Sequence, residues 1–201
     1  MSQDRYPISP VYSSVTMPPF TIDTDGISDE QKKGAKFRFA YDGLIAQLSV
    51  PGFVEVLCAH EAAHKVYLAV AGVKDFKFFP ARIRYDPETD DYLADLASVQ
   101  GVGLPPPASR IDDLVFNTAR ALAAGGVIAR KLMPDTDGGD QNDKDRFLAF
   151  CDELSLRANF PVDAERIWKL AQNYVALDLE KPEILLFIKE EGEKIRSSLS
   201  Y

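Results

Sequence analysis

The sequence predicts an α+β protein that is mostly α-helical, with a small β-sheet or hairpin placed after its first long helix. Apolar residues recur at helical spacing over residues 53–71 and through most of the second half of the chain. Between residues 76 and 97, short runs of aromatic and β-branched residues are instead typical of strands. A length of 201 residues suits one domain that buries a substantial core.

The N-terminal stretch differs in composition from the rest of the chain. Residues 1–30 combine Ser and Thr with several prolines, which favours an extended or partly disordered arm, and residues 31–201 are predicted to form a single domain. The prolines of the arm are Pro7, Pro10, Pro18 and Pro19. From residue 28 to residue 49 the apolar pattern is mixed and predicts a short helix or two.

A strong helical pattern predicts a helix over residues 53–71, with Gly72 as its C-terminal cap. One face of this helix is largely apolar, and both histidines of the chain fall on that face. The face is formed by Leu57, His60, His64, Tyr67, Leu68 and Ala71. The two imidazoles are therefore expected to point into the protein interior.

Three strand-like runs follow the first long helix, over residues 76–79, 81–85 and 92–97. The polar stretch of residues 86–91 has turn chemistry and is predicted to join the last two strands as a hairpin. Residues 101–107 include three consecutive prolines and predict a loop.

A second long helix is predicted from Arg110 to Met133, with Ser109 and Asp112 forming a capping box at its start. Two adjacent glycines, Gly125 and Gly126, fall inside this helix, where each costs about 1 kcal/mol relative to alanine. Such a cost is usually offset by the close packing of another backbone, so the pair predicts a close crossing with the histidine-bearing helix. The alternative is a tolerated weak spot.

Three further helices are predicted over residues 142–158, 163–179 and 182–199. The last two carry apolar stripes that are typical of a helical bundle core. These stripes are formed by Ile167, Trp168, Ala171, Tyr174, Val175, Ile184, Leu185, Ile188 and Ile195.

The charge and the cysteines narrow the range of functions and compartments. A formal net charge of -8 and a pI near 4.8 argue against nucleic acid or an anionic membrane as a partner. No apolar run approaches the ~20 residues needed to span a bilayer, and residues 1–10 lack the apolar centre of a signal peptide. Cys58 and Cys151 lie in apolar helical patterns and are predicted to be buried free thiols, which suits the cytoplasm.

The most informative motif is His60-Glu61-Ala62-Ala63-His64, which contains the only two histidines of the chain. This His-Glu-x-x-His pattern is typical of zinc metallopeptidases. Residues i and i+4 lie on one face of a helix, so both imidazoles can bind one metal ion. Glu61 follows the first histidine and is placed to take a proton from water at the metal.

A catalytic zinc site usually has three protein ligands, and with no third histidine the third must be a carboxylate or a thiolate. Asp143 is the best candidate, because it shares the apolar face of its predicted helix and a core-facing carboxylate needs a partner. The residues on that face are Phe147, Phe150, Cys151 and Leu154. Asp140 is predicted to be the N-cap of this helix but stays an alternative ligand, and Asp145 falls on a more polar face.

In these segments the chain resembles the peptidase module of the FtsH-type membrane-associated, ATP-dependent zinc proteases. That family has His-Glu-Ala-Gly-His, then a helix with a Gly-Gly-Arg-x-Ala-Glu-Glu-Leu type segment, then a Gly-Ala-x-x-Asp segment. The corresponding segments are residues 60–64, 125–132 and 139–143, and the resemblance covers about residues 50–160.

The resemblance implies a zincin-like helical peptidase domain. It also implies that His60, His64 and Asp143 bind zinc and that Glu61 is the general base. The expected activity is hydrolysis of peptide bonds in unfolded or flexible proteins, with the substrate extended along an edge strand near residues 76–79. The alternative is a non-proteolytic zinc-binding regulatory or scaffold module derived from such a peptidase.

The chain departs from the family at several points, among them Lys144, which stands where the family usually has an apolar residue. Ala63 replaces a glycine, and Arg130 and Lys131 replace the Glu-Glu pair. There is also no Gly-x-x-x-x-Gly-Lys-Ser/Thr loop of an ATPase. Substrates are therefore expected to arrive already unfolded or to be delivered by a separate ATPase partner, with a homo-oligomer also open.

Overall fold

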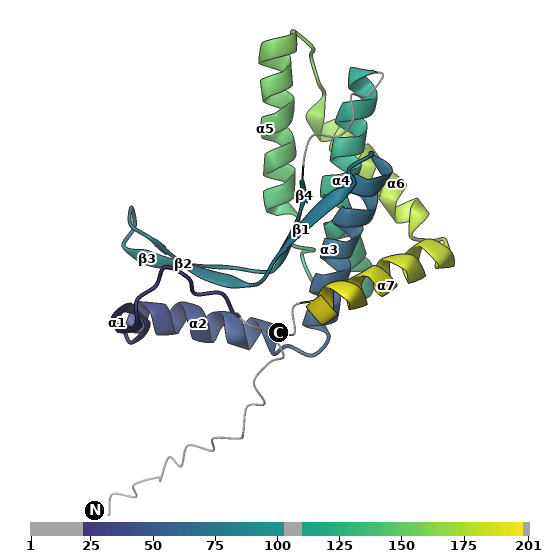
Figure 1. Cartoon of the computed structure of the whole chain (residues 1–201). Coiled ribbons are helices and arrows are strands. Elements are labelled where there is room, and N and C mark those ends of the chain that lie inside the picture. The colour runs from purple at the N-terminus through teal and green to yellow at the C-terminus, as the bar shows by residue number, and fades with distance from the viewer. Residues whose placement is uncertain (1–21, 103–109, 199–201) are drawn as a thin grey trace, which may run out of the picture.

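The computed structural model describes residues 22–102 and 110–198, and these residues form a mostly helical α+β fold, as predicted. Two limbs meet at an angle (Figure 1). One limb contains the short N-terminal helices beneath a β-hairpin, and the other contains the five long helices. Of the predicted N-terminal arm, residues 1–21 lie outside the described residues. The described remainder is attached to the fold, because Asp23 forms a parallel bridge with Arg82.

Two helices occupy the segment for which a short helix or two was predicted: α1 (Asp29–Lys32) and α2 (Ala35–Leu48). Ser28 caps α1 in a reciprocal arrangement with Gln31, which satisfies two backbone donors at the helix start. Phe37 of α2 is buried and packs edge-to-face on Tyr92 of the hairpin above it. This contact joins α2 to the hairpin.

The histidine-bearing helix is α3 (Phe53–Val70), which lies at the centre of the molecule. It ends within one residue of the prediction: Ala71 is the C-cap, and Gly72, just after it, adopts a φ of +96° that most residues avoid. The N–H of Gly72 donates to Ala69 at 2.9 Å, and the N–H of Val73 donates to Leu68 at 3.0 Å. These two bonds form a Schellman motif that stops the helix and turns the chain into the first strand.

Four short strands make two separate antiparallel pairs. The hairpin of β2 (Arg82–Asp86) and β3 (Asp91–Asp95) confirms the predicted turn at residues 86–91. The other pair joins β1 (Asp75–Phe79) to β4 (Ser98–Val102).

The prediction of one strand over 92–97 followed by a loop at 101–107 is wrong where the structure describes it. The third strand ends at Asp95, the chain turns through the buried Ala97, and β4 continues to Val102. The pairing partner of β4 is β1, and the paired residues are 19 to 27 positions apart in the chain. Local alternation does not reveal such a non-local pairing. Gly101 fits the strand because a Cβ there would lie 2.9 Å from Val73 Cγ1.

The remaining four helices confirm the predicted ones to within two residues at each described end. They are α4 (Ile111–Leu132), α5 (Gln141–Ala158), α6 (Ala164–Asp178) and α7 (Pro182–Ser198). Ser109 lies outside the described residues, so the predicted capping box of α4 is not seen. Tyr174 was predicted to be in the core but is 53% exposed, because the buried stripe of α6 narrows to Trp168, Ala171 and Val175.

The core has two parts, which meet at α4. One surrounds α3 and reaches α2, α7 and the strands, and the other lies between α4, α5 and α6 around Phe147 and Trp168. Cys58 and Cys151 are buried and unbridged, which confirms the prediction of free thiols. Within the described ranges no single helix is long and apolar enough to cross a membrane, although α2 and α3 pass that test jointly across a bend of 88°.

Candidate metal centre

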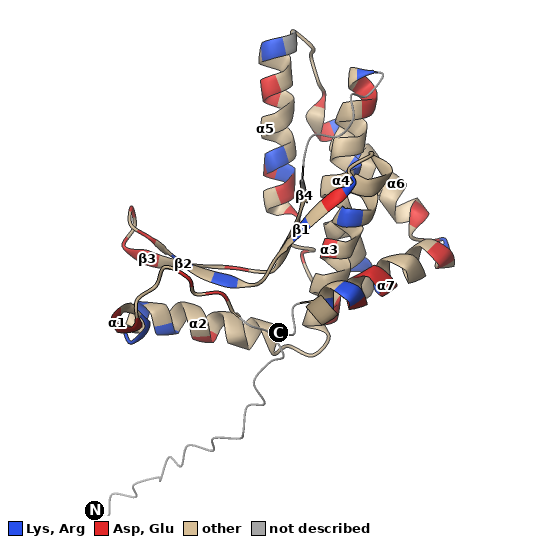
Figure 2. Cartoon of the chain, viewed as in Figure 1, with Lys and Arg blue, Asp and Glu red and all other residues tan. Residues whose placement is uncertain are grey.

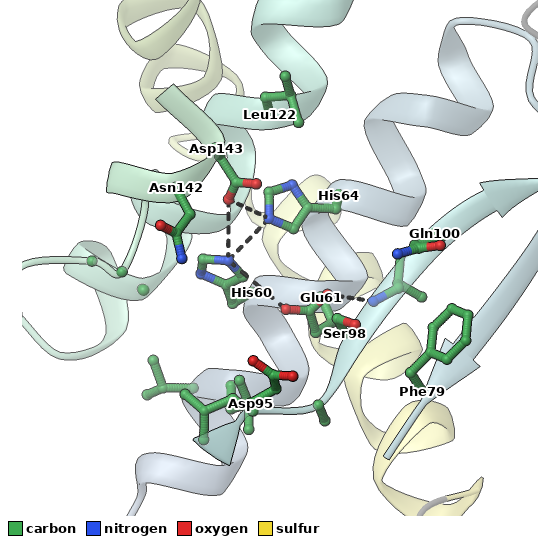
Figure 3. Close-up of a pocket in the computed structure, with 18 of the residues that line it drawn as sticks. His60, Glu61, His64, Phe79, Asp95, Ser98, Gln100, Leu122, Asn142 and Asp143 are labelled. Atoms are coloured by element: carbon green, nitrogen blue, oxygen red, sulfur yellow. Dashed lines mark hydrogen bonds and ion pairs between the residues drawn. The ribbon is translucent and has the colours of Figure 1, made fainter. Parts of the chain in front are cut away.

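The two histidines lie one helical turn apart on α3 and direct their Nε2 atoms at the same point (Figure 3). These two nitrogens are 2.9 Å apart. His64 is buried and His60 is largely buried, so water solvates neither ring freely. Two uncharged imidazoles in this arrangement would bring their lone pairs together, so the pair needs a shared proton or a cation between the nitrogens.

Asp143 reaches the same point from the first turn of α5 (Figure 3). Its Oδ2 atom lies 3.3 Å from His64 Nε2 and 3.9 Å from His60 Nε2. Together with the 2.9 Å between the two nitrogens, these separations bracket the ~3.3 Å between two ligand atoms that each lie ~2.0–2.1 Å from a tetrahedral zinc ion. Asp143 is 9% exposed and shares its face with the buried Phe147 and Cys151. The donor set and its spacing therefore fit zinc with one position left open.

Asp140 does not join this group. It occupies the N-cap position of α5, as predicted, but its side chain makes no capping bond. Its carboxylate instead accepts hydrogen bonds from Arg130 at 3.1 and 3.0 Å and from Gln172 at 3.2 Å. Asp140 would have to break all three bonds to reach the histidines, so the geometry favours Asp143. Asp145 is exposed, as its polar face predicted.

Backbone groups contact both imidazoles. His64 Nδ1 lies 2.7 Å from the carbonyl oxygen of Ala121 on α4, so Nδ1–H donates to it. This bond fixes the tautomer of His64 that leaves its Nε2 free for a metal and holds the ring in place. His60 is hydrogen-bonded to the backbone of Gly138, in the loop between α4 and α5.

Gly125 on α4 lies directly against the two histidines. A Cβ built on it would overlap the Nε2 atoms of both rings and lie 2.6 Å from Cδ2 of His60. The close approach of α3 to α4 at Gly125 is therefore made by the two imidazole rings, and not by the backbone that was predicted for both glycines. Gly126 points elsewhere, because its Cβ would lie 2.5 Å from Cγ of Asp140. The two glycines thus make room on two different sides of α4.

Glu61 lies beside the histidine pair and is tied to the sheet. Its Oε1 atom is 3.9 Å from His60 Nε2, and its Oε2 atom accepts the N–H of Val99 on β4 at 2.7 Å. Burial raises the pKa of Glu61 to about 7, because the ionised form is poorly solvated there. One ligand atom from Glu61 and one from each histidine also fall within 4.8 Å of one another, so Glu61 is close enough to bind the same ion.

The charges of the group depend on each other. Burial, together with the neighbouring charge of His64, lowers the pKa of His60 to about 3. Burial also disfavours charge on His64, but the hydrogen bond to Asp143 and the charge of Glu61 outweigh it and raise the pKa of His64 to about 9. Asp143 is buried as well, yet His64 holds the pKa of its carboxyl below the usual range. One proton therefore occupies the place that a cation would take.

The loop between α4 and α5 is clamped to α4 by Arg130. Its guanidinium donates to both carboxylate oxygens of Asp140 and to the carbonyl of Asp137 at 2.9 Å. Within this loop Gly138 and Gly139 adopt φ values of +87° and +66°. The clamped loop carries the backbone that holds His60 and leads directly into the turn that bears Asp143. Arg130 thus has a structural role at one of the positions where the chain departs from the Glu-Glu pair.

The metal group lies in a cleft of about 580 Å³ between the two limbs. Helices α3, α4 and α5 and strands β2, β3 and β4 all contribute side chains to its lining. Of the expected substrate strand at residues 76–79, Phe79 lines the cleft, and the neighbouring strand β4 hydrogen-bonds Glu61. Apolar residues share the lining with polar ones, among them Phe53, Leu57, Phe79 and Leu122.

The sequence did not reveal the roles of Ala121, Gly138 and Val99. All three act through backbone atoms, which any residue type supplies, so no side-chain pattern marks them. The sequence also gave little indication of the role of Arg130. Arg130 and Asp140 are ten positions apart, and nothing in the sequence shows that the loop between them folds back to bring them together.

Comparison with known proteins identifies no relative: no family model, no curated protein and no solved structure matches this chain. The fold and the site together define a helical α+β protein with a candidate metal centre of two histidines and an aspartate.

Proposed function

We propose that the protein is a zinc-dependent metallopeptidase that hydrolyses peptide bonds in unfolded or flexible protein substrates. The observation that carries this proposal is the convergence of two histidine nitrogens and one aspartate oxygen on a single point in a cleft. A glutamate follows the first histidine at that point, as peptide hydrolysis requires. The resemblance of residues 50–160 to FtsH-type peptidase modules supports a zincin-like domain, and the free thiols support a cytoplasmic location.

In this proposal His60, His64 and Asp143 hold the ion. When bound, zinc would supply a Lewis acid that polarises the scissile carbonyl and makes water more acidic. Glu61 accepts the proton of the attacking water and later gives it to the leaving amine. The Val99 N–H holds one oxygen of Glu61, which leaves the other for this exchange. A pKa of about 7 suits a group that must both accept and donate a proton near neutral pH.

The strand nearest to the metal group, β4, is the edge along which we expect an extended substrate to lie. It belongs to a sheet of only two strands, so its side away from β1 has no strand partner in the described chain. Backbone pairing to such an edge holds a peptide without regard to its sequence. An edge of this kind admits unfolded segments and excludes folded ones, which agrees with the proposed substrate class.

A second function follows from the proximity of Glu61 to both histidines. If Glu61 binds the ion as a fourth ligand beside Asp143, the site is closed and has no general base. A closed site of this kind is typical of structural zinc. The protein would then be a non-proteolytic zinc-binding regulatory or scaffold module.

Metal content and casein cleavage of Glu61→Gln, Asp143→Ala and Asp145→Asn separate the two functions. For a peptidase, Glu61→Gln retains zinc and loses activity by ~10²–10⁴-fold. Asp143→Ala loses most of its zinc, and the exposed control Asp145→Asn behaves as the unmodified protein. Zinc loss in Glu61→Gln, with no cleavage by the zinc-loaded unmodified protein, would instead establish the closed site.

A further inference from the structure

The charged side chains of the cleft have an excess of positive charge once a metal is bound. Arg82 and Arg84 contribute to the lining from β2, and Arg146 contributes from α5. Away from the metal group, the carboxylates in the lining are Asp95 and Asp137. The two carboxylates at the metal group balance a bound dication. The loaded cleft is therefore positive, in a chain whose net charge is -8.

The arginines of β2 are only partly used within the protein. Both donate through Nε to the same oxygen of Asp95, at 3.0 Å from Arg82 and 2.9 Å from Arg84. Two guanidinium groups thus share one carboxylate. Their side chains are 48% and 51% exposed. Because these bonds use Nε, the terminal nitrogens of each group stay available to a further acceptor.

Arg146 approaches the metal group from another wall of the cleft. It lies one turn after Asp143 on α5, and its Nη1 atom is 3.7 Å from Asp143 Oδ1, with 70% of its side chain exposed. That distance is too long for a hydrogen bond. The guanidinium nevertheless lies beside a proposed metal ligand and lines the cleft. Figure 2 marks basic positions both on β2 and in the first turns of α5.

We propose that the cleft selects peptides that carry a carboxylate close to the bond at the metal, and that Arg84 and Arg146 bind this carboxylate. The cations in the described lining are all arginines, although lysine and arginine occur in similar numbers in the chain. Arginine presents a planar fork that fits both oxygens of a carboxylate, which lysine does not. This inference rests on the proposed peptidase function, which fixes where the peptide lies. It adds a substrate class to that function, namely peptides with an acidic residue near the cleaved bond.

The test measures peptide binding, so that it does not depend on hydrolysis. Zinc-loaded Glu61→Gln protein is titrated with fluorescent unstructured peptides, acetylated and amidated at their ends, that contain either Glu or Lys at one central position. The Glu peptide is expected to bind at least ~10-fold more tightly than the Lys peptide, and this difference should shrink at high salt. A third peptide, with Gln at the centre and a free C-terminal carboxylate, shows whether a terminal carboxylate is also accepted.

Matched arginine variants assign the preference. Adding Arg84→Gln and Arg146→Gln should bring the two peptides to within about twofold of each other. Adding Arg157→Gln should leave the preference intact, because Arg157 is 80% exposed on α5, pairs with Glu153 and does not line the cleft. Equal binding of both peptides by the parent protein would overturn the proposal. A preference that survives in the double variant would place the carboxylate on Arg82 or on the metal and would equally overturn the assignment to Arg84 and Arg146.

The two proposals fail in different ways. Binding of the Glu peptide without any casein cleavage by the unmodified zinc-loaded protein would remove the peptidase function but keep the acidic ligand. Casein cleavage without preference for the Glu peptide would keep the peptidase and remove its selectivity.

Discussion

Helix α3 is crossed by two other helices, and a glycine lies at each crossing, yet the two glycines serve different purposes. On α4, Gly125 lies against the imidazole tips of His60 and His64. On α7, Gly192 lies against the backbone of α3, where its Cβ would be 3.2 Å from both Ala59 N and Cys58 C. Gly125 leaves space for the imidazole rings of the metal group, and Gly192 leaves space for the backbone of α3. The same residue type therefore predicts a close approach but not what approaches.

The largest expected effect tests the α4 side. In Gly125→Ala the added methyl must displace both imidazoles, so zinc affinity should fall by ~100-fold or more. The unfolding free energy of the metal-free protein should change far less than the free energy of zinc binding, because the better helix propensity of alanine offsets part of the overpacking. Competition with a chelator and urea unfolding measure the two quantities. Zinc affinity equal to that of the unmodified protein would show that Gly125 has no special relation to the site.

An intermediate effect is expected at the neighbouring glycine. Gly126→Ala places a methyl on the Asp140 carboxylate and should disturb its pairing with Arg130, at a cost of ~1–3 kcal/mol of unfolding free energy. Zinc affinity should fall by no more than ~10-fold, because Asp140 is not a ligand. Chelator competition and urea unfolding again measure the two quantities. A larger zinc loss than in Gly125→Ala would transfer the ligand role from Asp143 to Asp140.

A smaller effect is expected on the α7 side. Gly192→Ala should cost about 1 kcal/mol, because a tight contact with a backbone outweighs the gain in helix propensity. Zinc affinity should stay within about twofold, since α7 contributes nothing to the cleft. Urea unfolding of metal-free protein gives the first value and chelator competition the second. Stabilisation by the methyl would show that α3 and α7 move apart easily.

The smallest expected effect is the number of protons released when zinc binds on the α4 side of α3. His64 has a pKa raised to about 9, so it is protonated at pH 7 and must lose its proton to bind zinc, whereas His60 is already neutral. Zinc binding should therefore release about one proton from His64 at pH 7, together with the fraction of a proton that the ion displaces from Glu61. Affinity should weaken as pH falls and level off above about pH 9. Calorimetry in buffers of different ionisation enthalpy gives the count, and zero protons at pH 7 would contradict the arrangement.

Much of this architecture was predictable because it is encoded in local periodicity. The i, i+4 histidines, the apolar face of Asp143 and the stop at Gly72 each depend on residues within a few turns of one helix. The pairing of β1 with β4 depends on residues 19 to 27 positions apart, and Leu96 and Ala97 gave no sign of where one strand ended. Tyr174 was wrongly predicted to be in the core. Helical spacing shows which face of a helix is apolar, but not how much of that face a neighbouring helix covers.

The site was predictable in its side chains and hidden in its backbone. His60, Glu61, His64 and Asp143 were all found from residue type and spacing, and the structure brings them together. Whether they bind zinc and cleave peptides stays a prediction. The groups that orient them could not be found, because a carbonyl or an amide has no signature in the amino-acid alphabet.

The turn of α4 from Ala121 to Gly125 therefore poses a problem for mutational scanning. It orients His64 with a carbonyl and accommodates both rings with an absent side chain. An alanine scan leaves Ala121 untouched, and most replacements there would keep the carbonyl, so the scan would report a tolerant position next to an intolerant one. Replacing the Ala121–Leu122 peptide bond by an ester would weaken the carbonyl as an acceptor and reveal a contribution that no side-chain replacement can reach.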